Sequence, residues 1–148
     1  MWIFNIKPVV NEVEFHPYLY QKDLKEFCDK ENIILFAYNP LVKGKYCDRD
    51  YCYQSNYDLF KEAPVNKLYN KYDKNKTKIT QGQIILNWHL CVGVVPIPGT
   101  SKPNRMKENL GAKNFIINNN YIEILNSYEE RKHRFCDGSQ IFGIDIFA

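Results

Sequence analysis

Short apolar segments alternate with helical segments along this chain, and that order constrains the fold more than any other feature. Ile33–Tyr38 (IILFAY) is a continuous apolar run, which is typical of a strand buried on both faces of a parallel sheet. Pro8–Phe15 and Gly93–Ile97 predict two further strands. Alternation of strands and helices predicts parallel strands joined by right-handed crossovers. The expected fold class is therefore α/β.

The helices are predicted from their start and stop signals. They are expected over residues 16–30, 58–74, 80–91, 103–111 and 120–131. The dipeptide His16-Pro17 predicts the first start, because Pro is favoured at the first helical position. Thr80, with Gln83 three residues later, predicts a capping box. Pro103 predicts the start of the fourth helix and Gly111 its end.

Composition excludes several classes of protein. The chain has 148 residues, 45% of them hydrophobic, which argues against disorder. No run approaches the ~20 apolar residues of a membrane span, and the opening MWIFNIKP is not typical of a signal peptide, so no membrane partner is expected. The net charge of +3 is spread without a basic stripe, so no nucleic-acid partner is expected. Five cysteines are interpreted as reduced thiols in the cytosol, and Cys47 with Cys52 lacks a second ligand pair, so no metal site is expected.

The segment Pro96–Arg105 (PIPGTSKPNR) carries the most chemical information. A predicted strand ends, a Gly-Thr-Ser turn follows, and a helix begins at Pro103. Backbone N–H groups at a helix N-terminus can bind an anion. Thr100 and Ser101 add hydroxyl donors, and Arg105 adds a guanidinium suited to phosphate. A nucleotide phosphate fits this segment, and a capped surface helix with a solvated Arg105 fits the pattern equally well.

Two other strand ends carry candidate side chains. Tyr38 is expected at the carboxyl end of a strand, where parallel α/β folds place their ligands. Its ring suits stacking on a flat ligand, and a tyrosine of the core or rim is the alternative. Glu12 and Glu14 point to one side of their strand, as either an acid–base pair or a hydrogen-bonded structural pair. His16 is expected to be structural.

Taken together, these segments resemble the C-terminal part of an aldo-keto reductase. The resemblance rests on Lys7–Leu19, Ala37–Leu41, Ile97–Ser101 with Arg105, the pair Glu108-Asn109 and the tail Gly143–Ala148. It covers nearly the whole chain from Lys7 onward, and the combination is more specific than any one segment.

The resemblance implies a (β/α)8 TIM barrel of which this chain supplies strands six, seven and eight with their flanking helices. The barrel in this chain would be incomplete, because such barrels need about 250 residues. Residues 1–148 would form a partial oxidoreductase domain, and the tail 135–148 would wall the substrate pocket. The family transfers hydride from a nicotinamide cofactor, usually NADPH, to an aldehyde or ketone.

The resemblance also implies a set of cofactor-binding residues. Tyr38 would stack on the nicotinamide ring, and Glu12 would face its carboxamide, where the family usually has Gln. The others would be Asn39, Leu41 and Lys43 along the pyrophosphate, Thr100, Ser101 and Arg105 at the adenosine ribose and its 2′-phosphate, and Glu108 and Asn109 at the adenine. Gly99 stands where many NADPH-specific members carry Lys, so NADP is expected and NAD stays open.

The family's catalytic tyrosine, lysine, aspartate and histidine sit on earlier barrel strands, so none of them matches a residue here and no catalytic residue is expected. The leading interpretation is a cytoplasmic fragment that keeps the cofactor side of an NAD(P)H-dependent carbonyl reductase and is inactive alone. A small carbonyl substrate would bind only in a completed barrel. The alternatives are a non-catalytic nucleotide-binding or interaction module, self-associating through open barrel edges, and an inactive truncated gene product.

Overall fold

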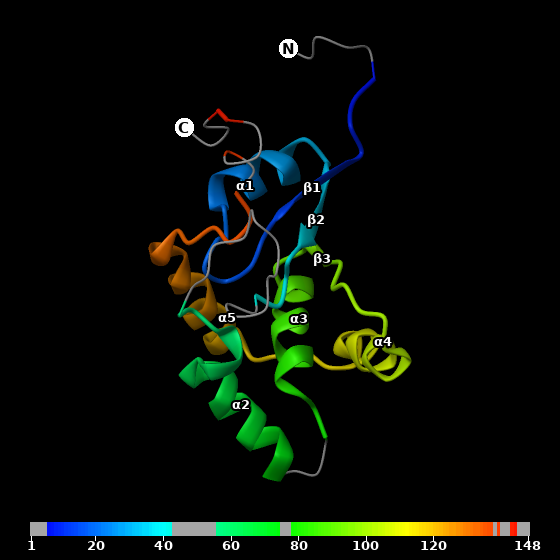
Figure 1. The fold of residues 1–148 in the computed structure, drawn as a ribbon, viewed down its shortest axis with the longest axis vertical. Helices are drawn as coiled ribbons and strands as arrows, with labels where there is room; N and C mark the ends of the chain where they lie inside the picture. Colours follow the sequence, from blue (N-terminus) through cyan, green and yellow to red (C-terminus); the bar gives the residue numbers. More distant parts are fainter. Residues whose placement is uncertain (1–5, 43–55, 75–77, 138, 140–142, 145–148) are drawn as a thin grey trace.

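The structure contains a three-stranded parallel sheet, in the order β1–β2–β3 (Figure 1). The computed structural model describes residues 6–42, 56–74, 78–137, 139 and 143–144. The strands are β1 (Val10–Glu14), β2 (Ile34–Tyr38) and β3 (Val95–Pro96). Glu14 pairs with Tyr38, so these two strands end at the same edge of the sheet. The predicted α/β class with parallel strands is confirmed.

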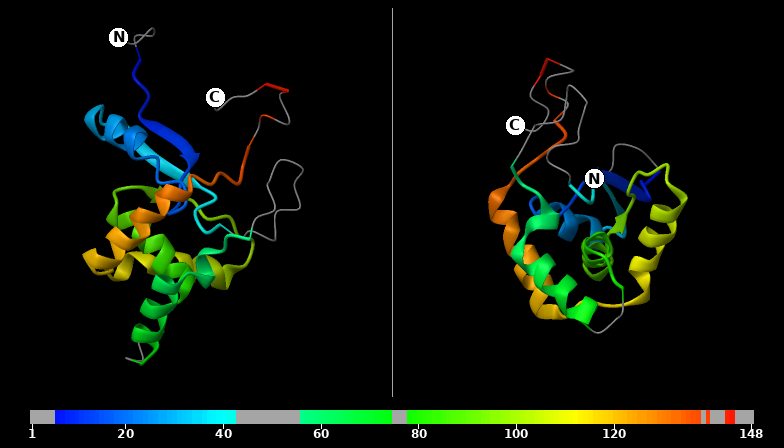
Figure 2. Two further views of the ribbon diagram at one scale, coloured as in Figure 1. Left: turned by 90° about the vertical axis from the view of Figure 1, so that its left-hand side faces the viewer. Right: turned by 60° about the horizontal axis from the view of Figure 1, so that its bottom comes forward.

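Helices follow the strands in the chain (Figure 2). They are α1 (Lys22–Lys30), η1 (Leu59–Lys61), α2 (Ala63–Lys74), α3 (Gln81–Cys91), α4 (Pro103–Leu110), η2 (Gly111–Asn114), α5 (Asn119–Asn126) and η3 (Ser127–Arg131). The predicted helix over 103–111 is confirmed, with Gly111 as its C-cap. The predicted helix over 120–131 is confirmed in α5, and its last part tightens into the 3-10 turn η3.

The predicted helix start at His16-Pro17 is wrong, because α1 begins at Lys22. The backbones of His16 and Leu19 pair across a tight turn instead. Pro is favoured at the second position of such a turn as well as at the start of a helix. Gln21 then adopts a left-handed conformation (φ 49°), which separates the turn from the helix.

The predicted helix over 58–74 is interrupted. Asp58 does begin a helical segment, since its carboxylate accepts the N–H of Phe60. Glu62 is extended, with ψ 136°, and α2 starts after it. Pro64 explains the break, because its ring would clash with the carbonyl of residue 60 in a continuous helix.

The third strand is shorter than predicted. Gly93–Ile97 was expected to form a strand, but only Val95–Pro96 pairs with β2. Val94 is buried, whereas Val95 and Ile97 are both more than a third exposed. Helix α1 packs against β2, and α3 packs against β3. On the sheet face that carries Val95, the side chain of Ile34 in β2 is 48% exposed. The face that carries Ile34 and Val95 is therefore largely open in this chain.

Helix α3 is the centre of the hydrophobic core. It contacts α2, α4, α5, β3 and the two turns η1 and η2. Its side chains Ile84, Ile85 and Trp88 are fully buried, as expected for a helix that is apolar all round. The buried imidazole of His89 faces two backbone carbonyl oxygens, those of Ile85 and Phe15. Among the described residues no helix is both long enough and apolar enough to cross a membrane.

The predicted capping box at the start of α3 is confirmed. The N–H of Gln83 donates to Thr80 Oγ1 at 3.2 Å, and the N–H of Thr80 donates to Gln83 Oε1 at 2.9 Å. The Thr80 hydroxyl also donates to Glu108 Oε1 at 2.6 Å. The same cap therefore links the start of α3 to α4.

Replacing Thr80 tests this cap. We expect Thr80→Ala to lower the free energy of unfolding by about 1–2 kcal/mol, because the variant leaves an N–H of α3 and the Glu108 carboxylate without their partner. Thr80→Ser retains the hydroxyl and should stay close to the parent chain. Denaturant-induced unfolding followed by circular dichroism measures both. An alanine variant as stable as the serine variant would contradict the proposed role of the cap.

Candidate functional site

A cleft of about 850 Å³ lies where the loop after β2 meets the starts of α3 and α4. Its lining includes six of the predicted cofactor-binding residues, namely Asn39, Leu41, Thr100, Arg105, Glu108 and Asn109. The carboxyl ends of parallel strands share one edge of a sheet, which is why segments from different parts of the chain meet here. The geometry groups these residues and leaves their role in cofactor binding as a prediction.

The remaining predicted residues lie outside that lining. Tyr38 is the last residue of β2 and is partly buried, and Glu12 is exposed in the middle of β1. Ser101 is exposed in the turn beside Thr100. Lys43 lies outside the described residues, as do Cys47 and Cys52. Within the described parts of the chain, no group of three or more potential metal ligands occurs.

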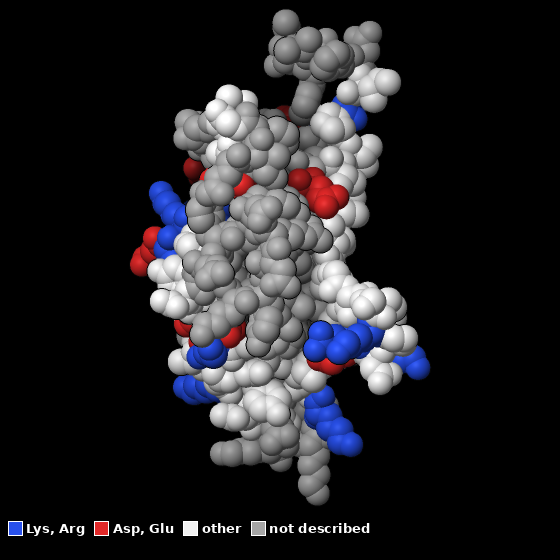
Figure 3. All heavy atoms as spheres, viewed as in Figure 1, with Lys and Arg blue, Asp and Glu red and all other residues white. Residues whose placement is uncertain are grey.

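The start of α4 supplies donors for an anion. Its N-cap is Lys102, which makes no side-chain hydrogen bond to the helix, and Pro103 occupies the first turn. The hydroxyl of Thr100 accepts the N–H of Lys102 at 3.2 Å, which shapes the turn. Figure 3 shows basic side chains over α4 with acidic atoms beside them. An uncapped helix N-terminus beside Arg105 is suited chemically to a phosphate.

Glu108 has structural partners on the α3 side of the cleft. Its carboxylate accepts the Thr80 hydroxyl, and its backbone carbonyl accepts Gln83 Nε2 at 2.9 Å. This carboxylate is therefore held in place before any ligand binds. Asn109 is partly exposed one residue further along α4.

The loop after β2 has an unusual backbone. Asn39 has φ 50° and Val42 has φ 39°, both in the left-handed region. Asn tolerates that region, whereas a β-branched residue such as Val rarely adopts it. Both residues line the cleft, and Val42 is 1% exposed. Strained positions of this kind often occur at binding sites.

Tyr38 keeps its proton at neutral pH. Burial raises the pKa of its phenol, and the negative charge of Glu14 raises it further. Tyr38 is also opposite Glu14 in the parallel register. Its ring is therefore an uncharged surface at the end of β2, which suits stacking on a flat ligand.

Glu12 and Glu14 differ in burial. Glu12 is exposed, whereas Glu14 is fully buried and accepts hydrogen bonds from Asn39 Nδ2 at 3.0 Å and from the N–H of Phe135 at 3.0 Å. Of the two sequence interpretations, the structure favours a structural role for Glu14. Sequence reasoning did not identify its partners in the tail, because no local pattern signals a contact 121 positions away.

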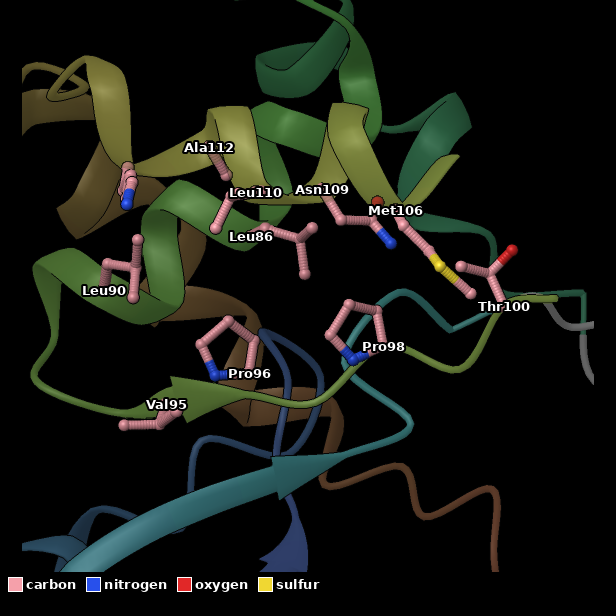
Figure 4. A pocket seen from close by; sticks show the side chains of 11 residues that line it. Leu86, Leu90, Val95, Pro96, Pro98, Thr100, Met106, Asn109, Leu110 and Ala112 are labelled. Carbon is pink, nitrogen blue, oxygen red and sulfur yellow. The ribbon is translucent and has the colours of Figure 1, made fainter. Parts of the chain in front are cut away.

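A second cavity, of about 460 Å³, lies between α3, β3 and α4 (Figure 4). Leu86 and Leu90 of α3 face Met106 and Leu110 of α4 across it, and Pro96 lies along the β3 side. Its lining is mostly apolar, so it offers few partners for a phosphate or a ribose. The larger cleft matches a nucleotide better.

Comparison with known proteins identifies the family. Residues 3–130 match the family model described as "Aldo/keto reductase family". Aldose reductase B of Dictyostelium discoideum is 34% identical over 142 residues, which cover 96% of this chain and 40% of that protein. Aldose reductase C of the same organism is 35% identical, over 96% of this chain and 39% of its own length.

A vertebrate relative agrees with these two. Aldo-keto reductase family 1 member A1-A of Danio rerio is 34% identical, over 92% of this chain and 41% of its own length. The chain therefore spans about two fifths of the length of these curated relatives. The family match extends over most of the chain, and the chain belongs to the aldo/keto reductase family.

Proposed function

We propose that this chain is the cofactor-binding part of an NAD(P)H-dependent reductase that converts aldehydes or ketones to alcohols. In this proposal its three strands are strands six, seven and eight of a (β/α)8 barrel, which is the fold that the family implies. The observation that carries the proposal is the 850 Å³ cleft at the strand ends, with Asn39, Arg105 and Asn109 in its lining. Ligands of such barrels bind at this end, often with a phosphate beside a helix N-terminus.

The residues present fit a nicotinamide dinucleotide. The uncapped start of α4 and Arg105 would bind the 2′-phosphate, with Thr100 and Ser101 at the ribose. Asn39 and Leu41 would lie along the pyrophosphate together with Lys43, which is outside the described residues.

The other two contacts complete the proposed site. Tyr38 would stack on the nicotinamide, with Glu12 accepting the carboxamide NH2. Glu108 and Asn109 would face the adenine. When bound, the cofactor supplies the hydride for the carbonyl carbon, and these residues bind and orient it.

The alkoxide that forms when hydride reaches the carbonyl carbon also needs a proton, which the cofactor does not supply. In this proposal the family's general-acid tyrosine and the three residues that accompany it are not among the residues of this chain. Protonation in the transition state contributes much of the rate of such reactions. We therefore propose that the 148-residue chain binds the cofactor without turning over a carbonyl. In a completed barrel, the tail 135–148 would wall the substrate pocket.

The cellular location of the chain is part of the same proposal. Cys28 and Cys91 are free thiols among the described residues. Free thiols suit a reducing compartment, and we place the chain in the cytosol.

A second candidate is a non-catalytic module that associates with another chain. It is favoured by the exposure of Ile34 and Val95 on one sheet face and by the outer edges of β1 and β3, which lack a partner strand among the described residues. The two candidates differ in solution mass, because the module would form a dimer through these edges.

Cofactor binding and turnover test the first candidate in one preparation. The fluorescence of NADPH should change on addition of the chain and reach saturation. Arg105→Ala should weaken NADPH binding roughly 10-fold, because it removes the guanidinium partner of the phosphate. Lys107→Ala, which replaces an exposed basic residue on the same helix, is the matched control.

With a panel of aldehydes we expect no NADPH oxidation. Oxidation that Tyr38→Ala abolishes would refute the inactivity of the chain, and equal effects of the two alanine variants would refute the phosphate site.

Gly99 tests the cofactor preference. A Cβ added at this position meets no atom within 4 Å, so Gly99→Lys should be tolerated. The added cation should tighten NADPH binding roughly 3-fold to 10-fold and leave NADH binding unchanged, because only NADPH carries the 2′-phosphate. Gly99→Gln adds length without charge and serves as the control. If the lysine variant tightens both nucleotides equally, Gly99 does not lie beside the 2′-phosphate.

A further inference from the structure

The buried carboxylate of Glu14 collects donors from three segments of the chain. His16 Nε2 lies 3.2 Å and Asn39 Nδ2 lies 3.0 Å from Oε1. The N–H of Phe135 donates to the same oxygen at 3.0 Å, and the N–H of Cys136 donates to Oε2 at 3.1 Å. The side chain of Glu14 is fully buried, so these contacts replace its hydration.

All of these partners are donors, which requires a carboxylate rather than an amide. Burial alone would raise the pKa of Glu14, but the hydrogen bond and the electrostatic attraction of His16, with the hydrogen bonds from Asn39 and the Cys136 backbone, hold that pKa below its ordinary value. Burial lowers the pKa of His16, so His16 donates as a neutral imidazole. The Arg134 guanidinium lies 3.8 Å from Oε2 and supplies a positive charge.

The three segments have different places in the proposed site. Glu14 ends β1, and Asn39 follows β2 and lines the 850 Å³ cleft. Phe135 and Cys136 lie in the segment after η3, which runs past the ends of β1 and β2 in Figure 2. One carboxylate thus connects the cofactor cleft to the start of the tail.

We propose that Glu14 is a positioning residue that anchors the start of the C-terminal tail and the Asn39 side chain on one carboxylate. The proposal deepens the proposed function and rests on it for the roles of the cleft and the tail. Because Asn39 and the tail share the same acceptor, a displacement of either one changes the hydrogen bonding of the other. The wall that the tail would form is thereby set relative to the nucleotide.

Hydrogen exchange measured by NMR on the full chain, without nucleotide, tests the anchor. Glu14→Gln preserves shape but places an NH2 group against donors. We expect the amides of Phe135 and Cys136 and the side-chain NH2 of Asn39 to exchange roughly 10-fold faster or more. The amides of Ile85 and Leu86 in α3 should keep the parent rate. Glu130→Gln, exposed on η3, is the control and should change none of these rates.

Three results would overturn the anchor. In the Glu14→Gln variant, the Phe135 and Cys136 amides could keep the parent rate, or the α3 amides could accelerate equally, which indicates global destabilisation only. The third result needs no variant: unprotected exchange of the Phe135 and Cys136 amides in the parent chain. The affinity for NADPH is measured separately. If the parent chain binds no NADPH, the proposed function is refuted, while the hydrogen-exchange data still decide whether Glu14 anchors the tail. In a parent that binds, unchanged affinity in Glu14→Gln refutes the positioning of Asn39.

Discussion

The parallel pairing of β2 with both of its neighbours is the constraint on which the rest of the structure depends. Because the pairing is parallel, the ends of the strands meet at one edge of the sheet, and the segments that follow β2 and β3 lie beside each other there. Asn39 follows one strand and Thr100 follows another, and both line the same cleft. We propose that an elongated, charged ligand binds in this cleft, beside the uncapped start of α4.

The core and the cleft are connected through the first turn of α3. Thr80 caps this helix and binds Glu108 of α4, so a helix buried in the core fixes one that lines the cleft. Glu14 accepts hydrogen bonds from Asn39 and from the start of the tail. Two acidic side chains with different partners therefore position residues of the proposed cofactor site.

Local signals in the sequence predicted much of the fold. The capping pair Thr80 and Gln83 and the segment from Pro103 to Gly111 have short-range causes, and both were predicted correctly. Pro17 suits a turn as well as a helix start, and the choice depends on the tertiary environment of Tyr18, whose hydroxyl binds Glu62. Glu12 and Glu14 look equivalent in a strand pattern, and only contacts with residues far along the chain distinguish them. The exposure of Val95 likewise depends on what covers the sheet, which no local pattern encodes.

We propose that the cleft at the strand ends binds the nicotinamide dinucleotide. The most direct measurement is a map of backbone amide chemical shifts during titration of the full chain with NADPH. We expect saturable changes at Leu41 and across residues 99–109, with little change at Leu86 and Leu90 beside the apolar cavity. Saturable changes confined to Leu86 and Leu90, or none along residues 99–109, would contradict it.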